Sequence, residues 1–398
     1  MEVGGMSTGS DIAESISAEW NGLRRTEPTL PSEQYYAPQQ FERELQKIWY
    51  RNWLYLCRAA SLPAPLDYRT FQIGTQPILV LRDEAGQLRG FFNTCRHRGS
   101  ILCPQANGHL KAKALTCPYH SWTYDLRGRL ARIPMHGRPK LVELGDMQLY
   151  PIALTEWKGF LFASLHAQAP PPFEKALDDG IDSMAHWPLS ELVVGHTQSW
   201  KLQCNWKVFW ENYNECLHCP NVHPTLTSLV PIYGRGIMTE RDDPEWRQHE
   251  ASTDPKFKGG LRAGAETWST DGRAGPYRFQ GLTAEERRAG YHFVTALPSL
   301  YIVAHVDYAR AVRLLPTGPE QTELQAEWLF PREALADPAF DMRNSIEFVG
   351  KVIAEDGAAC ELAQRGLHAA PHRNGVLLPE EYELHRFHNW LRGELSRD

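Results

Sequence analysis

The chain has 398 residues, of which 42% are hydrophobic and 11% aromatic, and its formal net charge at pH 7 is -6. This length allows two domains, or one domain with a large insertion, and the composition suffices for an ordinary core. The negative charge and the lack of a long basic block argue against a nucleic-acid-binding protein. No apolar stretch is long enough to predict a membrane-spanning helix.

The first twenty residues have neither a basic n-region nor an apolar h-region, so no signal peptide is expected and the prediction is a cytoplasmic protein. The chain has eight cysteines. In a chain of this size without a secretory signal, they are expected to be thiols or metal ligands rather than a disulfide framework.

The first regular element expected is a helix that begins near residue 38, where apolar residues recur at helical spacing. From about 54 to 165, short β-rich runs alternate with turn signals, which predicts a compact antiparallel β domain. The proline-rich segment 168–173 is expected to be a stiff linker and a domain boundary. The residues that predict the helix are Phe41, Leu45, Ile48 and Trp49.

After the linker, the pattern predicts a helix in 173–187 and a strand in 193–206. Residues 235–290 are charged, glycine-rich and weakly periodic, as expected of long surface loops or a lid. Successive β-rich runs in 300–330 then predict a sheet. Two helices are expected to close the chain, around 340–366 and 380–395.

Two short loops in the β-rich region each carry one cysteine and one histidine. Cys95 and His97 form a C-x-H pair, and after nineteen residues Cys117 and His120 form a C-x-x-H pair. A zinc finger usually groups cysteines in one knuckle and histidines in the other. The mixed knuckles instead suit a two-iron cluster in which two thiolates hold one iron and two imidazoles hold the other. The alternative is a pair of ordinary hairpins.

A second group of candidate ligands lies in NECLHCPNVHP, residues 214–224. Its two cysteines and two histidines could close a tetrahedral zinc site. Alternatively, the histidines could hold an iron, with Glu215 beside them and the cysteines buried as small apolar groups. The four residues in question are Cys216, His218, Cys219 and His223.

Both stretches resemble one known family. CRHRG and CPYHSWTYDLRGRL are similar to the Rieske [2Fe–2S] domain, and NWKVFWENYNECLHCPNVHP resembles the catalytic motif of Rieske non-heme iron oxygenase large (alpha) subunits. This family includes ring-hydroxylating dioxygenases and choline, betaine and carnitine monooxygenases. The resemblance covers roughly residues 30–395 and implies an α+β fold. The implied parts are an N-terminal segment packed on the catalytic domain (1–50), an all-β Rieske domain (51–167) and a mononuclear iron domain (174–398).

In the implied catalytic domain, a curved antiparallel sheet wraps a long helix, as in helix-grip, START-like folds. The resemblance makes His218 and His223 two ligands of an Fe(II) site with a two-His-one-carboxylate set, which leaves positions open for oxygen. Asp356 is the third ligand carried over, and Glu355 is the close alternative. The cluster ligands carried over are Cys95, His97, Cys117 and His120.

The resemblance gives Glu215 a positioning role. In the family, an acidic residue here hydrogen-bonds an iron-bound histidine and reaches a cluster histidine of the neighbouring subunit. The partners expected are His218 of the same chain and His120 of the next chain in a homotrimer. Cys216 and Cys219 are then expected to be buried thiols that only pack. Ser121 stands where many relatives have glycine.

The implied reaction is reductive activation of O2, with hydroxylation or oxidative N-demethylation of a small organic substrate. The chain has no G-x-G-x-x-G fingerprint, so NAD(P)H is expected to act through a separate flavin and iron–sulfur reductase or ferredoxin. The residues ENYNECLHC resemble those of family members that act on quaternary ammonium or N-methyl compounds, so a substrate of this class is favoured. Trp210, Tyr213 and Tyr233 are candidates for a cation-binding cage. Aromatic-ring hydroxylation is the alternative. A zinc-stabilised or non-catalytic Rieske binding protein is less favoured.

Overall fold

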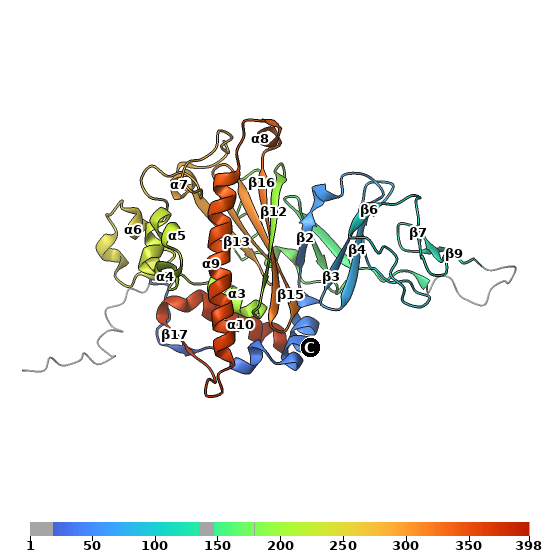
Figure 1. Ribbon diagram of the computed structural model, residues 1–398, viewed down its shortest axis with the longest axis horizontal. Coiled ribbons are helices and arrows are strands. Elements are labelled where there is room, and N and C mark those ends of the chain that lie inside the picture. The colour runs from blue at the N-terminus through green and yellow to red at the C-terminus, as the bar shows by residue number, and fades with distance from the viewer. Residues whose placement is uncertain (1–18, 135–146, 179, 398) are drawn as a thin grey trace, which may run out of the picture.

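The computed structural model describes residues 19–134, 147–178 and 180–397. Two parts lie side by side along the long axis of the molecule (Figure 1). The larger part combines a five-stranded antiparallel sheet with helices, and the smaller part is built from three small antiparallel sheets. The α+β class expected from the sequence is confirmed.

The segment that precedes the small sheets packs against the larger part. β1 (Glu27–Pro28) pairs with β17 (Val376–Leu377), which joins segments from opposite ends of the chain. η1 (Ser32–Tyr35) and α2 (Pro38–Glu44) follow, and α2 continues into a π-helical turn, η2 (Leu45–Trp49). The helix predicted near residue 38 is confirmed. Three of the apolar residues that predicted it are buried, namely Leu45, Ile48 and Trp49.

Short strands with turns between them fill the next region, as its alternating runs predict. The three sheets have the strand orders β10-β11-β2, β5-β4-β3-β6 and β7-β8-β9. β2 pairs with β11, so the two ends of this region are held together. The elements are β2 (Leu54–Arg58), η3 (Ala59–Ser61), β3 (Asp67–Ile73), β4 (Gln76–Arg82), β5 (Leu88–Phe92), β6 (Asn107–His109), β7 (Leu115–Thr116), β8 (Thr123–Tyr124), β9 (Leu130–Arg132), β10 (Ala153–Trp157) and β11 (Phe160–Ser164).

The large sheet has the order β12-β16-β15-β14-β13, and all neighbouring strands are antiparallel. The strands predicted in 193–206 and 300–330 are present in it. Its strands are β12 (Val193–Leu202), β13 (Tyr291–Ala296), β14 (Leu300–His305), β15 (Ala309–Gly318) and β16 (Gln321–Phe330). The helices of this part are α3 (Trp206–Tyr213), α4 (Cys219–Val222), α5 (Pro224–Leu229), α8 (Arg332–Ala336), α9 (Arg343–Leu367) and α10 (Tyr382–Ser396), with the 3-10 turns η5 (Phe173–Lys175), η6 (Pro231–Arg235) and η9 (Pro379–Glu381).

The large sheet has two buried faces. Successive side chains of a strand point to opposite faces, so Val312 belongs to the core under α9, whereas Ala311 shares a core with Phe162 of the small sheets. Figure 1 shows α9 lying across the sheet. The long helix against an antiparallel sheet is the catalytic-domain architecture that the resemblance implies.

The helix predicted in 173–187 is wrong. Among the described residues of this segment, only Phe173–Lys175 form a helical turn, and it is of the 3-10 type. Gly180 has a left-handed backbone (φ 82°), which ends any helix there. The Asp178 carboxylate accepts a hydrogen bond from the backbone N–H of Thr295 (2.8 Å), which ties the segment to the end of β13.

The segment 235–290 consists of short helical pieces joined by loops, but it is not only a surface layer. Trp246, Leu261 and Trp268 are buried. In the ranges that the structure describes, no helix is long and apolar enough to cross a membrane. The helical pieces are η7 (Glu240–Asp242), η8 (Trp246–His249), α6 (Pro255–Lys258) and α7 (Ala284–Ala289).

Candidate metal centres and active-site cavity

The two Cys/His loops of the small sheets have the same backbone turn. In the first, the Cys95 N–H donates to the Ser100 carbonyl (2.8 Å) and the Gly99 N–H donates to the Cys95 carbonyl (3.0 Å). In the second, the Ser121 N–H donates to the Cys117 carbonyl (3.0 Å). Gly99 and Ser121 are both left-handed, with φ of 71° and 58°. This conformation favours glycine, which explains why glycine suits position 121.

The turns gather four metal-binding side chains. Cys95 and Cys117 are buried, whereas His97 is exposed and His120 is partly exposed. The two imidazole rings lie with their centroids 4.7 Å apart. Two thiols inside and two imidazoles outside are the donor set of a Rieske cluster, in which sulfur and nitrogen bind different irons. The residues therefore fit a [2Fe–2S] cluster.

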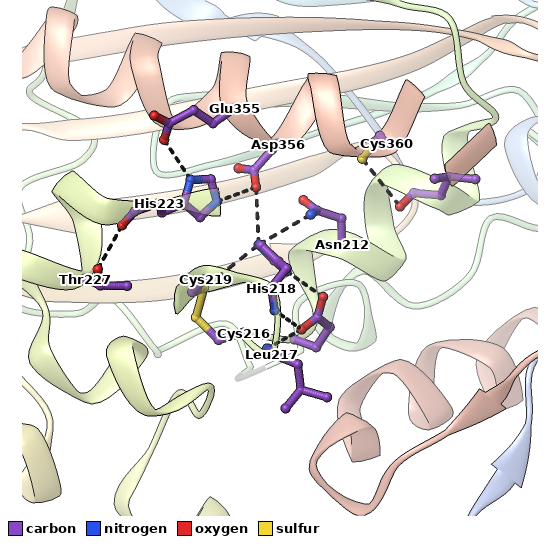
Figure 2. Close-up of polar contacts among 12 residues, drawn as sticks. Asn212, Cys216, Leu217, His218, Cys219, His223, Thr227, Glu355, Asp356 and Cys360 are labelled. Carbon is purple, nitrogen blue, oxygen red and sulfur yellow. Dashed lines mark hydrogen bonds and ion pairs between the residues drawn. A yellow bond between two sulfur atoms is a disulfide. The ribbon is translucent and has the colours of Figure 1, made fainter. Parts of the chain in front are cut away.

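The second centre is built from a loop and a distant helix. α3 ends at Tyr213, and the chain then carries His218 and His223 on either side of the short helix α4. Asp356 lies on α9. His223 Nε2 lies 2.7 Å from Asp356 Oδ1, and His218 Nε2 lies 3.4 Å from the same oxygen. One ligand atom from each of the three residues lies within 4.8 Å of the others (Figure 2).

The remaining nitrogen of each imidazole faces a different carboxylate. His218 Nδ1 lies 2.5 Å from Glu215 Oε1. His223 Nδ1 lies 2.9 Å from Glu355 Oε2 (Figure 2). A carboxylate on the outer nitrogen fixes the tautomer and leaves Nε2 free for a metal. Three convergent donors, with both rings oriented in this way, fit a mononuclear iron site with open positions. Glu355 orients His223, and Asp356 faces both histidines.

In the metal-free protein, the neighbouring carboxylates favour the protonated form of the two imidazole rings. Burial by itself would lower the pKa of His218, but hydrogen bonds and charge from Asp356 and Glu215 outweigh it and raise the pKa to about 9. The pKa of His223 is also raised, because Asp356 and Glu355 outweigh the effect of its burial. The pKa of Asp356 is lowered, because the two histidines outweigh the effect of burial. These directions are those of imidazole rings paired with carboxylates, and a bound metal ion would take the place of the protons.

Cys216 and Cys219 form a disulfide. The expectation that they are separate buried thiols is wrong. The Cys219 N–H donates to the Cys216 carbonyl (3.0 Å), and this turn brings their Cα atoms to 5.0 Å, a separation that a disulfide can span. A bonded pair cannot supply two thiolates, so the zinc alternative loses its sulfur ligands.

A cavity of about 410 Å³ opens onto the two histidines and Asp356. Of the three candidates for a cation-binding cage, Trp210, Tyr213 and Tyr233, only the two tyrosines line this cavity. Trp210 is fully buried, and its indole N–H donates to the Pro298 carbonyl (2.8 Å), so it belongs to the core. The other aromatic residues that line the cavity are Trp268, Tyr291, Phe293, Tyr301 and Tyr382.

The sequence does not mark Trp268, Tyr291, Phe293 and Tyr301 as cavity residues, for two reasons. Trp268 lies in the segment that was expected to be surface loop. Tyr291, Phe293 and Tyr301 lie on β13 and β14, where the register Phe293↔Val303 and Thr295↔Tyr301 puts them on one face. Period-two spacing could have grouped residues 291 and 293, but not their pairing with a residue of the next strand.

A buried ion pair fixes α3 behind the iron ligands. Lys207 Nζ lies 2.7 Å and 2.9 Å from the two carboxylate oxygens of Glu44, and the Trp206 indole N–H donates to the same carboxylate (2.7 Å). Lys207 and Glu44 are both fully buried. Trp206 and Lys207 thus join the N-terminal segment to α3.

Comparisons with known families agree with this geometry. The family described as "Ring hydroxylating alpha subunit (catalytic domain)" matches residues 189–396, just over half of the chain. The family described as "Rieske [2Fe-2S] domain" matches residues 52–151.

Relatives and solved structures point the same way. The glycine betaine monooxygenase oxygenase subunit of Chromohalobacter salexigens is 31% identical over 381 residues, which covers 91% of this chain and 84% of the relative. The chloroplastic choline monooxygenase of Beta vulgaris is 28% identical over 374 residues, covering 92% and 77%. The fold is similar to that of the quaternary ammonium Rieske monooxygenase CntA in complex with L-carnitine, with a TM-score of 0.70, 21% identity and coverage of 93% and 96%. The chain belongs to the ring-hydroxylating alpha-subunit family of Rieske oxygenases, and it is an oxidoreductase of the type that uses a Rieske cluster and a non-heme iron.

Proposed function

We propose that this chain is the terminal oxygenase for a quaternary ammonium compound, and that it hydroxylates a C–H bond of that substrate. The observation that carries the proposal is the aromatic lining of the cavity in front of the two-His-one-carboxylate set. Aromatic faces attract quaternary ammonium groups through their quadrupoles. The relatives named for glycine betaine, choline and carnitine oxidation support the same substrate class.

The aromatic residues of the lining pack against one another. The Trp268 and Tyr291 ring centroids are 5.4 Å apart, those of Tyr291 and Phe293 are 5.4 Å apart, and those of Tyr213 and Tyr301 are 4.3 Å apart. These contacts join neighbouring rings, which together present aromatic surface to the cavity. Asp356 and Glu215, which also line it, add negative charge at the end where the histidines lie.

The metal ligands remain part of the proposal. His218, His223 and Asp356 would hold Fe(II), and the two Cys/His loops would hold the cluster. When bound, these groups supply oxygen activation and single-electron transfer. The overall reaction takes O2, two electrons and two protons, inserts one oxygen atom into the C–H bond and releases water. At an N-methyl group, the hydroxylated product would break down to a tertiary amine and formaldehyde.

The electron path is proposed to cross between subunits. In Figure 1, the strand β7, which directly precedes the second Cys/His loop, lies at the opposite end of the molecule from α4. His97 and neighbouring Tyr119 are exposed at that end, where another subunit could dock. We infer a homotrimer in which His120 of one chain meets Glu215 of the next, with electrons from NAD(P)H delivered by a separate reductase. The related CntA has been described in terms of inter-subunit electron transfer. The cytoplasmic location stays a prediction.

The experiment is a substrate screen with the metal-loaded protein, a reductase and NADH. Glycine betaine, carnitine and choline are compared with naphthalene, and O2 uptake is measured together with product. The proposal expects O2 uptake coupled to product for at least one quaternary ammonium compound. Coupled oxidation of naphthalene alone would contradict it and would support aromatic-ring hydroxylation instead.

A further inference from the structure

One charged side chain of the cavity is not explained by metal binding. Arg310, on β15, lines the cavity although its exposed fraction is only 3%. Its register partners are Val303 on β14 and Trp328 on β16, which puts it on the sheet face that looks toward α9. The guanidinium is therefore in the interior, beside the space that a substrate would occupy.

This guanidinium has no anionic partner among the described residues. Nε and Nη1 of Arg310 are buried and make no hydrogen bond within the described ranges. Two aromatic rings lie near it. The ring centroid of Trp268 is 5.6 Å from Cζ of Arg310, and that of Tyr301 is 5.8 Å from the same atom. A buried charge without a counter-ion is strongly unfavourable unless something else completes the site.

The acidic residues of the cavity are engaged elsewhere. Asp356 and Glu215 hold the histidines. Asp178 accepts a hydrogen bond from the Thr295 N–H (2.8 Å), and Glu383 pairs with Arg386. Trp268, another lining residue, has an indole N–H that is buried without a hydrogen-bond partner among the described residues. The acidic residues that line the cavity therefore leave the Arg310 guanidinium without a carboxylate partner.

We propose that Arg310 binds a carboxylate of the substrate, so that this oxygenase takes a zwitterion whose ammonium group packs against the aromatic residues. The inference rests on the proposed function and narrows its substrate class. Guanidinium and carboxylate have matching planar geometry and form two parallel charge-assisted hydrogen bonds. Such a ligand would supply the acceptors that the buried donors lack. Choline has the ammonium group but no carboxylate, so it would leave Arg310 unpaired.

The test measures binding calorimetrically to the metal-loaded protein under anaerobic conditions. The ligands are three carboxylated compounds of different length, glycine betaine, carnitine and gamma-butyrobetaine, together with choline. Truncating one partner of a buried charge pair costs enough to change affinity about 30-fold or more. The best carboxylated ligand should therefore bind about 30-fold or more tighter than choline.

Two variants test whether Arg310 causes the preference for carboxylated ligands over choline. Arg310→Met keeps the volume but removes the charge, so it should abolish the preference over choline. Arg313→Met is the matched control, because Arg313 lies on the same strand and donates instead to the Leu56 carbonyl (2.8 Å). It should retain the preference.

The outcomes separate this inference from the proposed function. If choline binds the wild-type protein as tightly as the best carboxylated ligand, or if Arg310→Met keeps the preference, the role of Arg310 is refuted while the quaternary ammonium substrate class stands. If no quaternary ammonium ligand binds, both proposals fail. The wild-type ligand series decides the matter even if Arg310→Met does not fold.

Discussion

His223 and Asp356 are 133 residues apart in the chain, yet Nε2 of the histidine lies 2.7 Å from Oδ1 of the carboxylate. The contact joins the loop after α3 to the middle of α9. Because His218 Nε2 also faces this oxygen at 3.4 Å, the three side chains define one point at the base of the cavity. The chemistry of the protein is proposed to take place at that point.

The assignment of the iron ligands predicts which substitutions remove the mononuclear iron. His223→Ala or Asp356→Ala should remove the mononuclear iron and leave about two irons per chain, with the visible spectrum of the cluster unchanged. Glu355→Gln is the matched control on the same helix, and it should keep the iron with affinity reduced about 10–100-fold, since Glu355 only orients His223. Metal analysis and absorption spectra measure both. Bleaching of the cluster in Asp356→Ala would contradict the assignment.

The pKa of His218 predicts a pH dependence of iron uptake. The raised pKa of about 9 means that the imidazole of the metal-free protein is protonated at pH 7, whereas a metal binds the neutral ring. Iron affinity should therefore rise with pH up to about 9, and Fe(II) binding near pH 7 should release about one to two protons per chain. An indicator dye under anaerobic conditions measures this release. Uptake without proton release would refute the prediction.

The same shift has the opposite effect on folding of the metal-free protein. The folded-state pKa of His218 lies above its usual value of 6.5. Its ion pairs therefore contribute their full stability below about pH 6.5, and this contribution is lost as the pH rises through about 9. In Glu215→Gln, which removes one of the two carboxylates, the thermal melting temperature should fall less over this range. An equal fall in both proteins would show that the ion pair does not contribute.

The buried pair of Glu44 and Lys207 predicts a large effect on stability. Glu44→Gln leaves the Lys207 charge buried without a counter-ion, which should cost about 3–5 kcal/mol. Adding Lys207→Met should restore much of that loss, because no charge then remains. Asp341→Asn removes an exposed pair with Arg343 and should change stability by less than about 1 kcal/mol. Thermal melting compares the variants, and equal losses in Glu44→Gln and Asp341→Asn would contradict the argument.

The substitution Glu215→Gln is expected to slow oxidation of the cluster without changing the structure. Glu215→Gln keeps the size and hydrogen-bonding capacity of the side chain, so the metal content and the proposed trimer should be retained. Rapid mixing of the reduced protein with substrate and O2 should show cluster oxidation slowed by about tenfold or more if the residue lies on the path between subunits. Wild-type rates of cluster oxidation would remove Glu215 from the path.

The parts of the molecule that the sequence predicts well are those with local patterns. The C-x-H and C-x-x-H loops and the H-x4-H spacing place ligands within a few residues of each other, and period-two runs mark the strands. The structure also gives Ser121 a left-handed backbone, a conformation that favours glycine.

The remaining features depend on contacts between distant segments. The disulfide of Cys216 and Cys219 needs the turn geometry of their loop, and the helix expected in 173–187 is replaced by turns tied to β13. In the sequence, nothing distinguishes Arg310 from other charged residues of a predicted strand. Only the packing of β15 under α9 shows that its charge is buried without a partner.

The most direct test of the account is the stoichiometry of one reaction. The wild-type protein is supplied with a reductase, NADH and a carboxylated quaternary ammonium substrate, and its turnover is compared with that of Asp356→Ala, in which the cluster remains. We predict one hydroxylated or demethylated product per O2 consumed by the wild-type protein, and no product from the variant. Product formation at the wild-type rate by an Asp356→Ala protein that contains only the two cluster irons would contradict the account.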